Sequence, residues 1–235
     1  MRVLVTGGLG FIGSNIVEYF LKQGSEVTVL DNLESSITRE IKGASCVNFD
    51  LTTPDFGSLP KLQDIDTLIH LAGPSSGMAS SKDPVGTISK GYSTTLNSLE
   101  IARIHGVQRF LFASSMVVYG NPKNPQNPVS EAEVCKPISH YGIGKLANEN
   151  LIEAFCTENR IGYNLIRMFN VYGIGQNLER MDQGLVSIFT SLLMKSPKLE
   201  VKGDLKRFRD LVYIDDVAET YFNLAQQNFY NGPIN

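Results

Sequence analysis

The sequence has little of what marks several classes of protein. Among its 235 residues there is no tryptophan, and there are only three histidines and three cysteines. The cysteines, Cys46, Cys135 and Cys156, are widely spaced and form no C-x-x-C pair, which disfavours both a disulfide framework and a zinc site. We therefore expect a protein of the reducing cytoplasm that needs no metal.

Long apolar runs and an excess of positive charge are also missing. No stretch approaches the about 20 apolar residues that cross a bilayer. The net charge is −3 and Lys and Arg do not cluster, so we expect neither nucleic acid nor a membrane as a partner. A strand pattern follows Met1 at once, which leaves no room for a signal peptide. With 42% hydrophobic residues, the chain can bury a proper core.

The first 24 residues read as a strand, a turn and a helix. Residues 3–5 are an apolar β-branched run, and residues 11–22 carry apolar side chains at helical spacing. The glycines between them fit G-x-G-x-x-G (8, 10, 13) and G-x-x-G-x-x-G (7, 10, 13) equally well. Such a turn lets the backbone approach a pyrophosphate, which the N–H groups of the helix N-terminus bind. Its place between strand and helix predicts a dinucleotide site.

A carboxylate at the end of the next strand sharpens this prediction. Asp31 follows Gly10 by 21 residues, at the end of a strand over residues 25–30. Such a carboxylate accepts the ribose hydroxyls of an adenosine and repels a 2′-phosphate, so NAD is favoured over NADP. The alternative is a solvated carboxylate that starts a turn with Asn32.

Strands and helices alternate along the first two-thirds of the chain. The alternation predicts an α/β fold: a Rossmann-type doubly wound parallel sheet with a small C-terminal substrate lobe. We expect a dinucleotide-binding domain over residues 1–170, with 204–218 packing back near it, and a lobe over 171–235 that is incomplete at its C-terminal end. The expected strands are 47–49, 66–73, 109–113 and 163–168, and the expected helices are 84–105, 139–159, 183–195 and 214–227.

Several segments carry smaller predictions. Residues 31–42 are expected to form a loop with a short helix, residues 75–82 a loop on the substrate side, residues 121–129 a surface loop, and residues 199–201 a short extended piece. Asp50 either lies beside an adenine amino group or forms an Asx turn, and the sequence favours neither. His70 has no acidic or nucleophilic neighbour in the sequence, so we expect it to pack or cap rather than to catalyse.

Tyr141 and Lys145 are four residues apart on an expected helix and therefore share one face. To act as a base near neutral pH, a phenol must lower its pKa from about 10 by roughly 3 units. A nearby ammonium and the positive nicotinamide ring supply that kind of stabilisation. Ser115, at the end of a central strand, is placed to share the proton of a reacting alcohol with the phenol. The alternatives are a surface Tyr-Lys pair without a role and a serine that caps a strand, which describes Ser114 better.

Seven motifs occur in one order and span nearly the whole chain. On them the sequence resembles the extended short-chain dehydrogenase/reductase superfamily, in its NAD-dependent nucleotide-sugar epimerase/dehydratase branch. The matching stretches are 6–13, 30–33, 70–73, 114–120, 141–145, 167–173 and 209–218.

The resemblance implies a role for each matching residue. Tyr141 is the base, Lys145 tunes it and binds the nicotinamide ribose, and Ser115 orients the sugar hydroxyl. Asn170 and Arg209 match positions that contact the diphosphate of the substrate, although Arg209 could instead form a surface ion pair with Asp210. The cofactor set comprises Gly7, Gly10, Phe11 and Ile12 at the pyrophosphate, Asp31 and Asn32 at the ribose, Asp50 and Leu51 at the adenine, and Leu71, Ala72 and Gly73 along the cofactor.

The type of reaction is indicated by a residue that is missing from the stretch just before the Val-Tyr-Gly motif. Dehydratases and decarboxylases of this branch carry an acidic residue there, whereas this chain has Met116 and Val117. Neither residue moves the extra proton that elimination needs. The resemblance then implies NAD-dependent epimerisation of a nucleotide-diphosphate sugar, at C4 of a UDP-hexose through a 4-keto intermediate, by a homodimer. A nucleotide-sugar dehydrogenase or reductase and a non-catalytic NAD-binding protein remain as alternatives.

Overall fold

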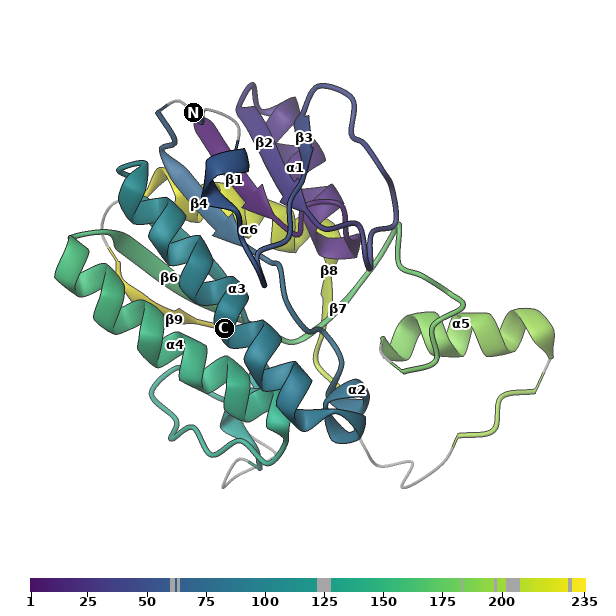
Figure 1. Ribbon diagram of the computed structural model, residues 1–235. Coiled ribbons are helices and arrows are strands. Elements are labelled where there is room, and N and C mark those ends of the chain that lie inside the picture. The colour runs from purple at the N-terminus through teal and green to yellow at the C-terminus, as the bar shows by residue number, and fades with distance from the viewer. Residues whose placement is uncertain are drawn as a thin grey trace.

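A seven-stranded parallel sheet forms the centre of the molecule (Figure 1). The computed structural model describes residues 1–59, 62, 64–121, 128–182, 184–196, 198–201, 208–227 and 230–235. In spatial order the strands are β3 (Ser45–Asn48), β2 (Glu26–Asp31), β1 (Arg2–Thr6), β4 (Thr67–His70), β5 (Arg109–Ser115), β6 (Gly162–Met168) and β9 (Gly232–Ile234).

Two pairs of helices cover the two faces of this sheet. On one face lie α3 (Pro84–Ile104) and α4 (His140–Asn159), side by side, and on the other α1 (Phe11–Lys22) and α6 (Ile214–Gln226) (Figure 1). Each pair closes its own apolar core, with Leu99, Phe110 and Ile152 on the first face and Ile16, Phe20 and Tyr221 on the second, all of them fully buried.

Local signals set the starts of the two helices on the first face. The Asp83 carboxylate accepts the backbone N–H of Gly86 at 2.9 Å, and Pro84 occupies the first helical position. In the same way the Ser139 hydroxyl accepts the N–H of Gly142 at 3.1 Å. The cap therefore places Tyr141 in the first turn of α4, which makes its position a local consequence of the sequence.

Several smaller elements connect the strands and helices of the sheet. They are α2 (Gly77–Lys82), a parallel pair β7 (Asn170–Tyr172) and β8 (Leu211–Tyr213), α5 (Leu185–Lys195), and the 3₁₀ turns Phe56–Ser58 and Met116–Tyr119. Helix α5 projects away from the sandwich (Figure 1). Within the part of the chain that the structure describes, no helix is long and apolar enough to cross a membrane.

The order of the strands creates a switch point in the middle of the sheet. From β1 the chain first builds outward through β2 and β3, and it then returns to place β4 on the other side of β1. Crossovers on the two sides of such a point diverge, which leaves a crevice at the carboxyl ends of the strands. The predicted Rossmann-type doubly wound sheet is confirmed. The predicted cofactor residues lie at or just after the carboxyl ends of β1, β2, β3 and β4, except Tyr141 and Lys145.

Three predictions about segments need correction, and a fourth lies mostly outside the described residues. Residues 31–42 contain no helix, because side chains there bond the local backbone instead. Residues 77–82 form α2, whose packing on α3 and α4 overrides the poor helix propensity of glycine and serine. Residues 199–201 form no strand. Most of the predicted loop 121–129 lies outside the described residues.

The predicted substrate lobe over residues 171–235 is smaller than expected. Helix α6 packs on α1 because Val217, Tyr221 and Leu224 are buried along one of its faces. Strand β9 pairs with β6 in the main sheet. Among the described residues of the predicted lobe, β7, β8, α5 and their loops are the parts that stand outside the layered core.

Candidate active site

The glycine turn after β1 is held by close backbone packing. Gly7 has φ +70°, and a Cβ there would lie 2.8 Å from the backbone nitrogen of Ala72. A Cβ at Gly13 would lie 2.3 Å from the carbonyl oxygen of Gly7. Both positions therefore require glycine for the fold itself, because this turn, the start of α1 and the end of β4 pass very close to one another.

Gly10 differs from these two glycines, because the packing around it does not require a glycine. It has an extended backbone (φ −78°, ψ 179°), and among the described atoms its Cβ would meet only the Gly7 carbonyl oxygen, at 3.5 Å. It is the N-cap of α1, and no described side chain caps this end of the helix. A Cβ would fill the space in front of the first N–H groups of α1, near Phe11 and Ile12. This uncapped cradle fits a pyrophosphate.

Asp31 is more fully bonded than the sequence suggested. One carboxylate oxygen accepts the N–H of Leu9 at 2.9 Å, and the other accepts the N–H of Leu33 and the hydroxyl of Ser36, at 2.9 and 2.8 Å. Two oxygens offer about four acceptor positions, so one remains for a ribose hydroxyl. To accept both hydroxyls, Asp31 must release Ser36. The side-chain oxygen of the neighbouring Asn32 accepts the N–H of Glu34 at 3.1 Å.

The residues predicted at the adenine have other contacts. The Asp50 carboxylate accepts both the N–H and the hydroxyl of Thr52 at 2.8 Å, so the Asx turn forms. The side chain of Leu51 is only 3% exposed and belongs to the core. Its carbonyl oxygen accepts the amide of Asn97 at 2.8 Å. A role of these two residues at the adenine stays a prediction, and for Leu51 it is restricted to the backbone.

His70 is a structural residue, as predicted. It is fully buried at the end of β4, and its ring nitrogens lie 2.8 Å from the hydroxyl of Thr6 and 3.1 Å from that of Thr95. The ring stacks on Phe112. Burial, aided by the positive charge of Lys145, lowers the pKa of His70 to about 3, so the ring is neutral. Beyond it, Leu71, Ala72 and Gly73 lead into the crevice.

The three predicted catalytic residues meet where β5 ends against α4. The Tyr141 hydroxyl lies close enough to the Ser115 side chain for the two to interact. The Lys145 ammonium donates to the carbonyl oxygen of Ala113 at 2.6 Å and lies 5.7 Å from the centre of the Tyr141 ring. Tyr141 and Lys145 also line a small cleft together with Ala72 and Gly73. The fold thus brings residues from β4, β5 and α4 to one place, although the roles assigned to them stay predictions.

The protein's own groups do not give the phenol the low pKa that a base near neutral pH needs. Burial raises the pKa of Tyr141 to about 12, against a smaller lowering by the adjacent Ser115 side chain. Burial also lowers the pKa of Lys145 to about 8. Desolvation disfavours both charged forms, so stabilising the phenolate needs the second positive charge that the prediction named beside Lys145. A nicotinamide ring carries such a charge.

The two residues predicted at the substrate diphosphate lie on the β7–β8 side. The Asn170 amide donates to the carbonyl oxygen of Asp210 at 2.7 Å, which ties β7 to the segment before β8. Arg209 is exposed, and its guanidinium donates to the adjacent Phe208 carbonyl at 2.9 Å. No ion pair with Asp210 is found among the described residues. The role of Asn170 and Arg209 in binding substrate stays a prediction.

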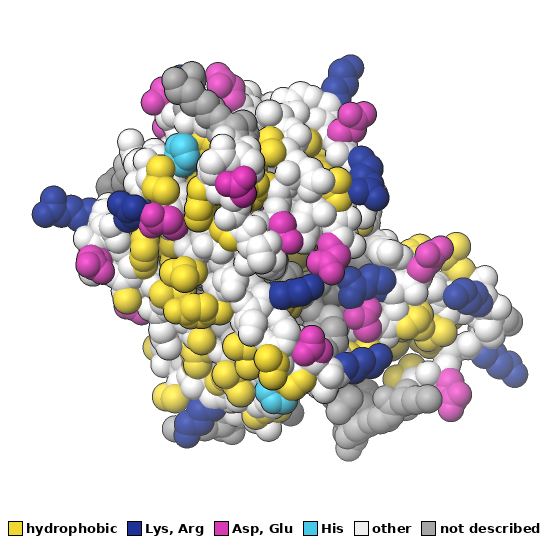
Figure 2. All heavy atoms as spheres, viewed as in Figure 1, with side chains coloured by type: hydrophobic (Ala, Val, Ile, Leu, Met, Phe, Trp, Pro, Cys, Tyr) yellow, Lys and Arg dark blue, Asp and Glu magenta, His cyan; other side chains and the backbone are white. Residues whose placement is uncertain are grey.

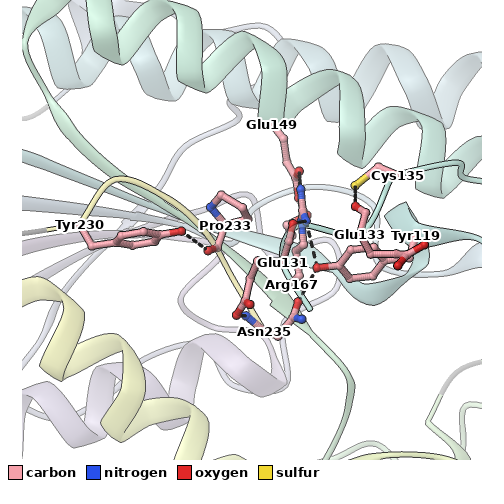
Figure 3. A network of polar contacts seen from close by, with 10 residues as sticks. Tyr119, Glu131, Glu133, Cys135, Glu149, Arg167, Tyr230, Pro233 and Asn235 are labelled. Carbon is pink, nitrogen blue, oxygen red and sulfur yellow. Dashed lines mark hydrogen bonds and ion pairs between the residues drawn. The ribbon is translucent and has the colours of Figure 1, made fainter. Parts of the chain in front are cut away.

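A buried ion pair beneath the site escaped the sequence reasoning. Glu149 of α4 and Arg167 of β6 join through two guanidinium nitrogens, with a shortest distance of 2.7 Å, and their side chains are 2% and 7% exposed. The Ser114 hydroxyl also donates to Glu149. In Figure 3 Arg167 lies between Glu149 and Tyr119, whose hydroxyl accepts from Arg167 at 2.9 Å. Two signals were present: Glu149 shares a helix face with Lys145, and Arg167 interrupts an apolar strand.

Comparison with known proteins identifies the class that this fold and site define. The model of the NAD dependent epimerase/dehydratase family matches residues 3–234. The chain belongs to this family.

Similar proteins include epimerases and decarboxylases. A protein of Methanocaldococcus jannaschii is 34% identical over 99% of the chain, which covers 75% of that protein. UDP-glucuronic acid decarboxylase 1 of Arabidopsis thaliana is 33% identical over the whole chain, which spans 54% of it. The chain thus spans between about half and three quarters of the length of these relatives.

Solved structures agree with this assignment. The UDP-glucose 4-epimerase of Thermotoga maritima, crystallised with UDP-glucose, superposes with a TM-score of 0.90 at 31% identity. It matches the whole chain, which covers 76% of it. The UDP-glucose 4-epimerase of Thermus thermophilus in complex with NAD gives a TM-score of 0.85 at 30% identity, with 100% of this chain and 77% of that one covered.

Proposed function

We propose that this chain is an NAD-dependent nucleotide-sugar epimerase that inverts C4 of a UDP-hexose through a 4-keto intermediate. One observation carries the proposal: Tyr141, beside Ser115, shares a cleft with Lys145, Ala72 and Gly73 at the switch point of the sheet. The chemistry then requires a base and a hydride acceptor beside one sugar carbon, and the crevice offers both a phenol and a dinucleotide cradle. The match to known epimerases supports the same reading.

Three residues of this chain act on the proton of the C4 hydroxyl. Tyr141 takes the proton of the C4 hydroxyl, which Ser115 holds at hydrogen-bond distance, and returns it in the second half of the reaction. Lys145 bears the positive charge that favours the phenolate. Bound NAD supplies reversible acceptance of a hydride from C4. Since the 4-keto sugar keeps its nucleotide, it can turn in the site while the diphosphate stays bound.

Binding of the cofactor and substrate falls to the predicted sets. For NAD we propose Gly7, Gly10, Phe11, Ile12, Asp31, Asn32, Asp50, Leu51, Leu71, Ala72, Gly73, Tyr141 and Lys145. For the sugar nucleotide we propose Ser115, Asn170 and Arg209; the guanidinium of Arg209 is exposed, and a guanidinium suits a diphosphate.

The direct test is interconversion of UDP-glucose and UDP-galactose. Purified protein, supplied with NAD, is incubated with each sugar, and the C4 epimer is measured by chromatography. Wild type should approach the same ratio from both sides, and Tyr141→Phe, which keeps the ring, should not. A panel of GDP-, dTDP- and CDP-sugars in a thermal-shift assay identifies the preferred nucleotide, because a specific ligand raises the melting temperature. Wild type without epimer formation from any sugar nucleotide would overturn the proposal.

The same preparation separates the alternatives. A net dehydrogenase or reductase consumes free NAD or NADH, which absorbance at the nicotinamide band follows, whereas an epimerase regenerates its cofactor. A non-catalytic binder retains NAD and forms no product. Release of carbon dioxide from UDP-glucuronic acid would point to the decarboxylase branch, which Met116 and Val117 argue against.

We also propose a homodimer formed through α3 and α4. Hydrophobic side chains gather on the face that these helices cover (Figure 2). On α3 the exposed apolar residues Val85, Ile88, Tyr92 and Leu96 are spaced by three or four, so they form one stripe. Light scattering should give twice the chain mass, and Tyr92→Glu should give the monomer. A monomeric wild type would contradict the dimer. The cytoplasmic location stays a prediction, which cell fractionation tests.

A further inference from the structure

Helix α4 presents one row of side chains to the end of β5. Tyr141, Lys145 and Glu149 follow one another at intervals of four, so they lie one above the other on the same helix face. Each reaches one of three consecutive residues of β5: Lys145 donates to the carbonyl of Ala113, Glu149 accepts from the hydroxyl of Ser114, and Tyr141 lies beside the side chain of Ser115. The acid is thus the third member of one row.

The neighbouring strand holds Glu149 in this place. Arg167 lies directly across from Ser114 in the β5–β6 register, so the serine and the guanidinium approach the carboxylate from adjacent strands. Two guanidinium nitrogens of Arg167 and the hydroxyl of Ser114 donate to the carboxylate, and together they fix both of its oxygens. The other end of Arg167 is anchored on Tyr119, and Tyr119 donates to Asn235 at 2.7 Å (Figure 3). A buried charge that two residues from adjacent strands hold in this way has little freedom to move.

The charge of Glu149 acts on Lys145. Burial lowers the pKa of the Lys145 ammonium, and the negative charge of Glu149 works in the opposite direction. The other described groups around Lys145 do not replace it: Tyr141 is protonated in this form, and His70 of β4 is neutral. The nearest contacts from β5 are a carbonyl and the Phe112 ring, whose centre is 4.7 Å from the ammonium.

We propose that Glu149 is a positioning residue that acts through Lys145: from its socket of Ser114 and Arg167 it keeps the lysine charged and directed at the tyrosine. The inference rests on the proposed function for its meaning in turnover, but the effect on Lys145 exists in the ligand-free protein. Among the described residues, the Glu149 carboxylate forms its hydrogen bonds with Ser114 and Arg167, and none with Tyr141 or another residue that lines the cleft.

The experiment measures the protonation of Lys145 without turnover. The whole protein is labelled with acetic anhydride, which reacts with the neutral amine, over a range of pH, and the peptide that contains Lys145 is quantified by mass spectrometry. The midpoint of reactivity should lie lower in Glu149→Gln by on the order of one pH unit. Glu149→Asp, which keeps the charge on a shorter side chain, should fall between this variant and wild type.

Two controls separate the charge from a general loosening. Glu158→Gln makes the same change at an exposed position of the same helix, and Ser114→Ala removes a bond but no charge. Both should leave the midpoint within about 0.3 pH units of wild type, within the scatter expected without a charge change. Should Glu149→Gln fail to fold, Glu149→Gln/Arg167→Gln replaces it, because that pair buries no unmatched charge.

Turnover adds a second readout. Because Lys145 is needed as the ammonium, the descending limb of kcat against pH should move to lower pH in Glu149→Gln by the same amount, with KM for the sugar nucleotide unchanged. A labelling midpoint equal to wild type in the glutamine variants, or an equal shift in Glu158→Gln, overturns the inference. A shifted midpoint in a protein that forms no epimer instead refutes only the proposed function.

Discussion

The two halves of the crevice are built in different ways. On the β1–β2 side the chain satisfies itself: backbone meets backbone at Gly7, and Asp31 already accepts three donors. On the β5–α4 side long side chains are held in apolar surroundings, where burial opposes the charged forms of Tyr141 and Lys145. The first half is made to be stable without a ligand. The second half contains two groups, Tyr141 and Lys145, whose pKa values burial has shifted. Perturbed pKa values of this kind are typical of catalytic sites.

The largest effect should come from the second half. Tyr141→Phe removes the hydroxyl that moves the proton but keeps the ring, so kcat should fall by about 10²–10⁴. Bound NAD, measured after denaturation, and the melting temperature should stay near those of wild type. Retention of more than a tenth of the activity would mean that another group is the base, and the contrast between the halves would be wrong.

Breaking the buried ion pair should destabilise the second half. Arg167→Met leaves Glu149 buried without its partner, and such a loss costs about 3–5 kcal/mol of unfolding free energy. The matched control is Arg103→Met, whose pair with Glu100 has a 2.6 Å contact but a half-exposed arginine side chain. That change should cost less than about 1 kcal/mol. Urea unfolding of both variants measures the difference, and equal costs would contradict the role assigned to burial.

In the first half of the crevice, two alanine substitutions separate the glycine needed for packing from the glycine needed for the cofactor. Gly7→Ala forces a Cβ against the backbone of Ala72 at φ +70°, and should cost about 1–3 kcal/mol of stability. Gly10→Ala meets no close neighbour in the protein, so stability should not change. The affinity for NAD should instead fall by about tenfold or more, because the added carbon stands where the pyrophosphate approaches. Calorimetric titration with NAD, beside urea unfolding, distinguishes the two outcomes.

Lys145 should reduce the stability of the ligand-free protein at neutral pH. Its pKa falls from 10.5 to about 8 on folding, so the charged form is less favourable in the native state. This loss is complete below pH 8 and disappears as pH rises from 8 to 10.5. Lys145→Met should therefore stabilise the fold at pH 7 by on the order of 1–3 kcal/mol, and less as pH increases. Unfolding at several pH values checks the sign, and a gain that grows with pH would contradict it.

The smallest effect concerns a second buried phenol. Tyr221 of α6 is fully buried, and its hydroxyl has no hydrogen-bond partner among the described residues. Tyr221→Phe should raise the free energy of unfolding by about 1 kcal/mol, since an unsatisfied polar group is removed. Activity should not change, in contrast to Tyr141→Phe. A loss of stability would show that the hydroxyl has a partner, such as a buried water.

Part of the fold could be read from local patterns. Strand β1, helix α1 and the start of α4 follow from an apolar run, glycine spacing and a serine cap, and the predicted helix over residues 11–22 has the bounds of α1. Helix α2 and the absence of a helix over residues 31–42 could not be read, because packing on α3 and the side-chain bonds of Asp31 decide them. Residues 204–218, which include the start of α6, were expected to pack back near the sheet. For the same reason the sequence did not place the rest of α6 or β9 there: their partners are distant in the sequence.

By itself the sequence determined that the chain is a doubly wound α/β protein with a dinucleotide cradle and a Tyr-Lys pair, since all of these are periodic or short-range features. Only the tertiary structure showed that the Asp31 carboxylate already accepts a hydrogen bond from Ser36, that burial raises the pKa of Tyr141, and that Arg167 holds Glu149 beneath Lys145. The reason is physical: a motif specifies which groups are close along the chain, whereas charge and solvation depend on what surrounds a group from every side.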